Sequence, residues 1–397
     1  MRIKRRMLAS LAALVVALPT GLVVATMSAA EAAVPATIPL TITNNSGRAG
    51  AVYIYVLGQS LTTNRLGWAN ASGQFTPWAA GGLPPTPAPD VSIAGPANGQ
   101  SRTIQIPKLS GRVYFSIGEK LKFFLTPTGL VQPAPWNPSD ANRNILFDWS
   151  EYTLNDTGLW LNSSQVDMFA IPHSVSVTNT SNQRSTTGEL VAGGRNRVLD
   201  AIKNQPGGWA NLIHTRADGT RLRAFAPGKG IDAGTLPADI MKPYIDKAWN
   251  AYTGGRVLTV APFAGQSVRY YGRTSGNAMN FTNASGQQVA SFQKPSTANV
   301  FGCDGALHAP NDLVVGPIAR TLCAALNRST LHNISTQPST DPAAFYLDPV
   351  TNHYSRKIHN HMVDGKAYGF AFDDVGAFES LVKDPNPRSA GVVLTPF

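Results

Sequence analysis

The sequence predicts a mainly β fold that contains a mixed α/β segment. Glycine (36 residues) and proline (29) are abundant in the 397-residue chain and only 14% of its residues are charged. This composition is typical of many short strands joined by tight turns. Up to about Val177, β-branched and aromatic runs alternate with turn signals, whereas helical patterns appear after residue 185. A chain of this length suffices for two domains, or for one large domain with an insertion.

The N-terminal half is expected to contain strands and no helix. The turn signal Asn44-Asn45-Ser46-Gly47 separates the first two runs, and the Pro/Gly-rich stretch 81–89 indicates a surface loop. The expected strands of this half are residues 41–43, 51–57, 102–107, 112–117, 147–155 and 166–177.

The second half adds helices. Residues 237–252 have apolar residues at helical spacing and a C-terminal Gly254-Gly255 signal, although Pro243 implies a kink or a later start. Residues 188–202 and 313–326 are also expected to be helical, the first less regularly because of Gly193 and Gly194. Strands are expected at 221–226, 257–260, 267–271 and 278–281.

The N-terminus predicts export. Basic residues Arg2, Lys4, Arg5 and Arg6 precede an apolar run at 8–24, and Ala30-Glu31-Ala32 offers a cleavage site. We expect a signal peptide over residues 1–33 and a secreted mature protein; the alternative is an uncleaved membrane anchor. Cleavage lowers the formal charge from +10 to +7, carried by scattered side chains. This distribution predicts no nucleic-acid partner, and the mature chain is expected to have no membrane attachment.

The two cysteines, Cys303 and Cys323, predict one disulfide in an exported protein. Such a bond would stabilise the fold by roughly 3 kcal/mol in the chain-entropy model. The alternative is a pair of buried free thiols.

Two carboxylates stand out near one turn signal in the segment 147–167. Glu151 and Asp167 flank this turn among aromatic and hydroxyl residues. Glycoside hydrolysis requires such a pair, one carboxyl to protonate the leaving oxygen and a second to activate water or attack the sugar. Alternation along a strand places Glu151 on one face with Trp149 and Thr153. Each carboxylate alone would be read as a surface group or a turn cap.

The register of this hairpin has two alternatives. A turn centred near Asp156-Thr157 places Glu151 opposite Asn162, with Asp167 beyond it. A longer loop centred near Leu159 makes the two carboxylates face each other. The sequence does not distinguish the two.

Other catalytic patterns are missing or incomplete. His359-x-His361 with Asp364 lacks a further metal ligand, so we expect no metal site there. The chain contains no Gly-x-Ser-x-Gly elbow and no P-loop, and Gly228-Lys229-Gly230 fits a turn better than a dinucleotide loop. No cofactor is expected.

The patterns at 40–57, 151–167 and 359–376 together resemble glycoside hydrolase family 64, in the same order and over nearly the whole mature chain. These are secreted endo-β-1,3-glucanases, including the type that releases laminaripentaose. The resemblance implies a thaumatin-like β-barrel or sandwich domain, an inserted mixed α/β domain and a wide cleft between them. We place the β-rich domain at 34–185, the insert at 186–255, and the strands and helices that complete the barrel and cleft wall at 256–397.

The resemblance also implies roles for individual residues. Glu151 would be the general acid and Asp167 the general base of an inverting hydrolysis. The residues expected to bind substrate are Thr153, Asn155, Trp160, Ser164, Tyr368, Asp373 and Asp374. For Asp373-Asp374, the alternative is a pair of turn residues.

The sequence therefore predicts a monomeric, secreted endo-β-1,3-glucanase acting on curdlan, laminarin or fungal-wall glucan. The alternative from another class is a non-catalytic, thaumatin-like glucan-binding or antifungal protein. A hydrolase of a different polymer is a third reading. The intact Glu151/Asp167 pair favours the enzyme.

Overall fold

The structure, a computed structural model, describes residues 33–397. The predicted signal peptide therefore lies outside the described residues, apart from its last position. Among the described residues, no helix combines the length and the hydropathy needed to cross a bilayer.

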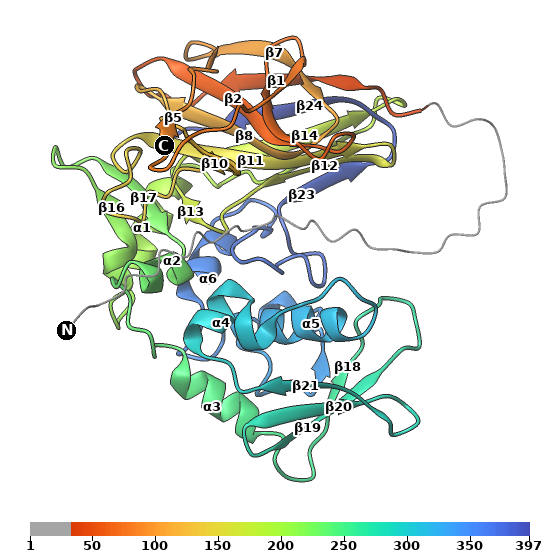
Figure 1. The fold of residues 1–397 in the computed structure, drawn as a ribbon. Helices are drawn as coiled ribbons and strands as arrows, with labels where there is room; N and C mark the ends of the chain where they lie inside the picture. Colours follow the sequence, from red (N-terminus) through yellow and green to blue (C-terminus); the bar gives the residue numbers. More distant parts are fainter. Residues whose placement is uncertain (1–32) are drawn as a thin grey trace. The chain divides into compact units, whose positions relative to one another are not determined.

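A five-stranded sheet, here called sheet A, is built from both ends of the described chain (Figure 1). Its strands in spatial order are β15 (Arg184–Thr187), β14 (His173–Asn179), β24 (Pro387–Leu394), β1 (Thr37–Asn44) and β7 (Gln100–Pro107). Strand β1 pairs in parallel with β24 and antiparallel with β7. Its alternating sequence buries Ile38, Leu40 and Ile42 on one face, as a half-buried strand requires.

A larger sheet, here called sheet B, carries the segment with the two carboxylates. Its strands in spatial order are β23 (Leu381–Asp384), β12 (Gly158–Ser163), β11 (Leu146–Asn155), β8 (Leu109–Ile117), β2 (Val52–Ser60), β3 (Leu66–Ala69) and β4 (Phe75–Pro77), with β6 (Ile93–Ala94) paired to β2. Apolar side chains from sheets A and B form one core cluster, which includes Leu40, Val113 and Leu161. The opposite face of sheet B carries a second cluster around Trp149 and Tyr114.

Two small sheets adjoin these layers. The first contains β5 (Thr86–Pro87), β9 (Phe124–Thr126) and β10 (Gly129–Val131), and the second contains β13 (Met168–Phe169), β16 (Ile213–Thr215) and β17 (Arg221–Phe225). The expected strand at 166–177 is thus two strands, β13 and β14, which belong to different sheets.

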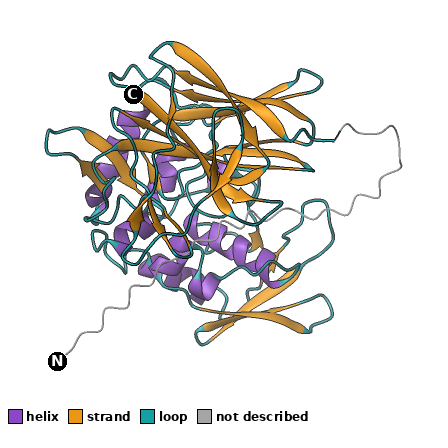
Figure 2. Cartoon of the chain, turned by 45° about the horizontal axis from the view of Figure 1, so that its top comes forward, coloured by secondary structure: helices purple, strands orange, loops and turns teal. Residues whose placement is uncertain are grey.

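The remaining elements form a mixed α/β part, where most of the helices gather (Figure 2). Its helices are α1 (Gly194–Lys203), α2 (Pro227–Asp232), α3 (Lys242–Asn250), α4 (Thr297–Gly302), α5 (Val315–Asn327) and α6 (His353–His359), with short 3₁₀ turns at Trp209–Leu212, Gly305–Leu307 and Pro342–Ala344. Its sheet contains β21 (Gln288–Gln293), β20 (Ala278–Thr282), β19 (Tyr270–Ser275), β18 (Leu258–Val260) and β22 (Thr336–Gln337) in that order. One large core cluster, separate from that of sheets A and B, includes Trp249, Phe281 and Leu322.

The three expected helices are confirmed with adjusted bounds. Helix α3 begins at Lys242 rather than at residue 237, because Pro243 is tolerated only in the first turn, where its missing N–H costs nothing. Helix α1 begins after Gly193, whose positive φ of 64° ends the preceding turn. Helix α5 spans residues close to those expected.

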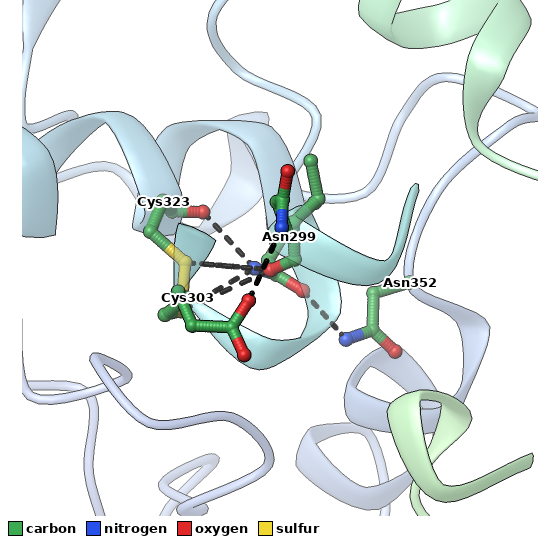
Figure 3. Close-up of a disulfide and its surroundings, with 7 residues drawn as sticks. Asn299, Cys303, Cys323 and Asn352 are labelled. Atoms are coloured by element: carbon green, nitrogen blue, oxygen red, sulfur yellow. Dashed lines mark hydrogen bonds between the residues drawn. A yellow bond between two sulfur atoms is a disulfide. The ribbon is translucent and has the colours of Figure 1, made fainter. Parts of the chain in front are cut away.

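The predicted disulfide is confirmed (Figure 3). Cys303 caps the C-terminus of α4 in a left-handed conformation, and Cys323 lies within α5, so the bond ties these helices together. Beside it, the buried Asn327 amide donates to the carbonyl groups of Val300 (2.7 Å) and Cys323 (3.0 Å). Asn352 in turn donates to Asn327 Oδ1 at 2.8 Å.

Candidate active site

Glu151 lies in the middle of β11, on the face of sheet B that is turned away from sheet A. Its cross-strand partners are Arg112 on β8 and Asn162 on β12. Directly opposed residues share a face, so these three side chains form a row across the sheet. Asn162 Nδ2 donates to Glu151 Oε2 at 3.4 Å, and Glu151 is only 8% exposed.

The hairpin adopts the first of the two registers. Asn155 pairs with Gly158, so Asp156 and Thr157 alone form the turn. Asn155 Oδ1 accepts hydrogen bonds from Thr157 N and Oγ1, at 2.8 and 2.7 Å, and so fixes the turn. The alternative loop centred near Leu159 is wrong. Asp167 lies beyond the end of β12, immediately before β13.

Arg112 connects the two carboxylates. Its Nε donates to Glu151 Oε1 at 3.2 Å, while Nη2 lies 3.1 Å from Glu151 Oε1 and 3.3 Å from Asp167 Oδ2. The guanidinium is stacked over Trp149, 4.4 Å from the ring centroid. A planar guanidinium held on an indole keeps its donors in a fixed plane, so Arg112 sets the separation of Glu151 and Asp167.

Lys229, from helix α2, contacts the other oxygen of Asp167. Its Nζ lies 3.1 Å from Oδ1 and 4.6 Å from the ring centroid of Trp136. Burial alone would raise the pKa of Asp167, but the positive charges of Lys229 and Arg112 outweigh it and hold that pKa below its usual value. Asp167 is therefore an ionised carboxylate with a cation at each oxygen.

The other predicted binding residues near Glu151 take several positions. Thr153 lies on the same face, two residues along β11, and its hydroxyl lies 3.0 Å from that of Ser110. Trp160 pairs with Thr153 across the hairpin and is partly exposed. Ser164 is buried at 1% exposure, and Asn155 uses its side-chain oxygen to fix the turn.

Tyr368 lies beside the segment that leads to Asp167. Its backbone exchanges two hydrogen bonds with Gln165, at 2.9 and 3.0 Å. Burial, followed by the negative charges of Asp374 and Glu151, raises the pKa of Tyr368 well above its usual value. Gln165 thus brings the C-terminal motif to the two carboxylates.

The structure does not bring Asp373 to an exposed position. Its carboxylate is fully buried and contacts Arg328 Nη2 at 2.8 Å, His359 Nε2 at 2.9 Å and Gly369 N at 2.9 Å. These donors give Asp373 the role of fixing the loop that carries Tyr368. Asp374, the next residue, is exposed.

The two cations of the site were missed from the sequence. Arg112 stands in a segment predicted only as a strand, and Lys229 in a segment interpreted as a turn. Alternation along 112–117 would have placed Arg112 on one face with Tyr114, but nothing local connects either cation with Asp167. Among residues 33–397, no cluster of three His, Cys, Asp or Glu side chains is placed to hold a metal ion.

Comparison with known proteins gives concordant matches. The family described as β-1,3-glucanase, glycoside hydrolase family 64, matches residues 36–394. A crystal structure of a laminaripentaose-producing β-1,3-glucanase in complex with laminaritetraose superposes with a TM-score of 0.88, at 60% identity, covering 91% of this chain and 99% of that one.

Two curated relatives are each called glucan endo-1,3-beta-glucosidase. They come from Arthrobacter sp. (strain YCWD3) and Cellulosimicrobium cellulans, and each is 50% identical over 361 residues, or 90% of this chain. The aligned region spans 65% of the length of either relative.

Proposed function

Because the chain belongs to glycoside hydrolase family 64, the β-1,3-glucanases, we propose that it is an endo-β-1,3-glucanase that cleaves polymeric β-1,3-glucan into short oligosaccharides such as laminaripentaose. The observation that carries this proposal is the pair Glu151 and Asp167, both held by the guanidinium of Arg112 on one face of sheet B. The similarity to a laminaripentaose-producing enzyme supports the product class.

In the proposed reaction Glu151 is the general acid and Asp167 the general base. Glu151 donates a proton to the glycosidic oxygen as the bond from that oxygen to the anomeric carbon breaks. A water molecule attacks the anomeric carbon from the opposite side and gives its proton to Asp167, so the configuration is inverted. The depressed pKa of Asp167 supports this division of roles, because a base must be ionised before the reaction.

The uncharged groups around the pair suit a neutral sugar polymer. Trp160 is partly exposed and offers an apolar ring, while Thr153, which is 7% exposed, carries a hydroxyl group that can both donate and accept hydrogen bonds. We therefore propose curdlan, laminarin or fungal-wall glucan as substrate, hydrolysed by a monomer without a cofactor.

Three finer assignments belong to the same proposal. Sheets A and B, with their shared core, support a thaumatin-like sandwich or barrel, and the separate core around Trp249 supports an inserted α/β domain that forms the other wall of a substrate cleft.

Secretion is part of the same proposal. It is supported by the basic and apolar pattern at the N-terminus and by the disulfide. N-terminal sequencing of protein recovered from a culture medium would test export.

Incubation of the purified protein with curdlan tests the function. We expect soluble oligosaccharides in chromatography, with the new anomeric centre appearing first as the α-anomer in NMR spectra. A first product with the β-anomer would contradict inversion. If the protein sediments together with the insoluble polymer and no soluble sugar appears, the chain is a glucan-binding protein and the carboxylate pair is a ligand contact.

A further inference from the structure

We propose that glucan binds across the strands of sheet B, along a second row of side chains that lies next to the Glu151 row. This inference rests on the proposed glucanase function and adds binding residues on both sides of the cleaved bond. The row, here called the outer row, consists of Lys383 (β23), Trp160 (β12), Thr153 (β11), Ser110 (β8), Gln59 (β2) and Leu66 (β3).

The strand register defines the outer row. Thr153 is directly opposite Trp160 on one side and Ser110 on the other, and the pairing continues to Lys383 and to Gln59 and Leu66. Thr153 is two residues from Glu151, so the whole row lies on the face of the catalytic pair. Six adjacent strands at about 4.8 Å per step make the row roughly 24 Å long.

This face changes from closed to open along the strands. On the inner side of Glu151, Trp149 and Phe147 are buried in an apolar cluster. In the outer row, by contrast, Lys383 and Gln59 are exposed and Leu66 is 42% exposed. The exposed side chains on this face of sheet B therefore lie on the outer-row side of Glu151.

The chemistry of the row fits an uncharged polyol. The hydroxyl groups of Ser110 and Thr153 are 3.0 Å apart; Ser110 is partly exposed and Thr153 is 7% exposed, so Ser110 is the more accessible of the two to a sugar hydroxyl. Gln59 Nε2 donates to Asn64 O at 3.1 Å, which orients the amide and leaves Oε1 as an acceptor. Trp160 offers a ring face, and Lys383 carries the single charge of the row.

The position of Glu151 divides the row. Strands β8, β2 and β3 lie on one side of β11, and β12 and β23 lie on the other. Gln59 and Lys383 must therefore contact sugar residues on opposite sides of the cleaved bond.

This division gives a directional test with Gln59→Ala and Lys383→Ala. The substrates are laminari-oligosaccharides of increasing length labelled at the reducing end. We expect each variant to lower kcat/KM on the longer oligosaccharides by about three- to tenfold, the size of one lost hydrogen bond. The preferred cleavage position should shift toward the labelled end in one variant and away from it in the other. Gln288→Ala, at an exposed glutamine of β21, is the matched control and should cleave as the wild type does.

Two results would overturn the outer row. The first is that both variants keep the kcat/KM and the cleavage positions of the wild type. The second is that the preferred cleavage position shifts in the same direction in both variants. A wild-type protein that cleaves no oligosaccharide of any length would instead refute the glucanase function itself.

Discussion

At the scale of single residues, Arg112 is the centre of the site. It contacts both Glu151 and Asp167, and its charge is partly removed from water by stacking on Trp149. A cation shared by two carboxylates lowers the repulsion between them and favours the ionised form of both. A further cation beside one of them favours the ionised form of that carboxylate more. Lys229 supplies that further charge to Asp167 alone, so the two carboxylates have different surroundings.

Replacement of either carboxylate by its amide tests their roles. Glu151→Gln and Asp167→Asn preserve shape but remove proton transfer, so each is expected to reduce kcat by at least about 100-fold. Binding to insoluble glucan, measured by sedimentation, should stay close to that of the wild type. Near-normal turnover in one variant would remove that residue from the mechanism.

Lys229 is expected to set the acid limb of the pH profile. Its charge helps to hold the pKa of Asp167 down, so Lys229→Met should raise this pKa and leave Asp167 protonated up to a higher pH. The acid limb of kcat/KM against pH should therefore move to higher pH. Lys229→Arg keeps the charge and should restore the wild-type limb. A limb that is unchanged in Lys229→Met would show that Asp167 is not the group titrating there.

The sequence indicates the two carboxylates as candidates but not the two cations beside them, and this difference has a physical origin. Glu151 and Asp167 are close in the sequence, on the β11–β12 hairpin and just after it, whereas Arg112 reaches them from 39 and 55 positions away. The sequence also shows no sign that Asp373 is buried, again because its partner is distant in the sequence. Its partner Arg328 is 45 positions away, and only the folded chain shows that this carboxylate is buried.

At the scale of elements, Asp148 joins strand β11 to the segment after β13. Its Oδ1 accepts from Trp149 N at 3.0 Å, and its Oδ2 accepts from Ala170 N and Ile171 N at 2.9 Å each. Only strand β13 separates this segment from Asp167, so the same contacts help to fix the position of the proposed base.

Asp148→Ala leaves these buried N–H groups unpaired, at about 1–3 kcal/mol for each donor that finds no water. We expect a clear loss in the free energy of unfolding, measured with denaturant. Asp90→Ala removes an exposed ion pair to Lys120 and should cost less than about 1 kcal/mol. Equal losses in the two variants would contradict this role of Asp148.

The same variant has a pH signature. Burial raises the pKa of Asp148 to about 7 in the folded protein, above its usual value of 3.8. The folded state then holds a proton that the unfolded state has lost, so this group weakens folding as pH rises toward 7. The stability difference between wild type and Asp148→Ala should therefore shrink as the pH rises from about 4 to about 7, and change little above that.

The disulfide is a second link between elements. It closes a loop of 20 positions between α4 and α5, so a Cys303→Ala/Cys323→Ala protein should lose roughly 3 kcal/mol of unfolding free energy. Reduced wild-type protein should lose a similar amount in the same denaturant titration. An unchanged unfolding midpoint would mean that the packing around Asn327 alone holds the two helices.

Element prediction succeeded where local chemistry decides the outcome. Pro243 implies a kink or a later start and lies in the first turn of α3, whereas Gly193 predicts only an irregularity and α1 begins six residues later than expected. It failed at 166–177, where one apolar run becomes two strands of different sheets. The periodicity of that run does not show where the first strand ends and the second begins. The division depends on contacts with Asp148 and with strand β17, which lie outside the run.

At the scale of the whole molecule, the chain order makes the sandwich depend on its C-terminal strands. Strand β24 lies in the middle of sheet A, between β14 and β1, and β23 extends sheet B beyond β12. Apolar residues of both strands, including Val382, Val392 and Leu394, belong to the core shared by the two sheets. The sandwich can therefore close only after the α/β part has been synthesised.

This order predicts that residues 34–186 will not fold alone. Without β24, sheet A separates into the pairs β14–β15 and β1–β7, each with an unpaired edge and an exposed apolar face. The isolated fragment should therefore aggregate and show no cooperative thermal transition by circular dichroism. The control is the same fragment joined through a flexible linker to residues 379–397, which restores both strands and should unfold cooperatively. Cooperative unfolding of the shorter fragment would refute the argument, and failure of the fused fragment would show that the sandwich also needs the α/β core.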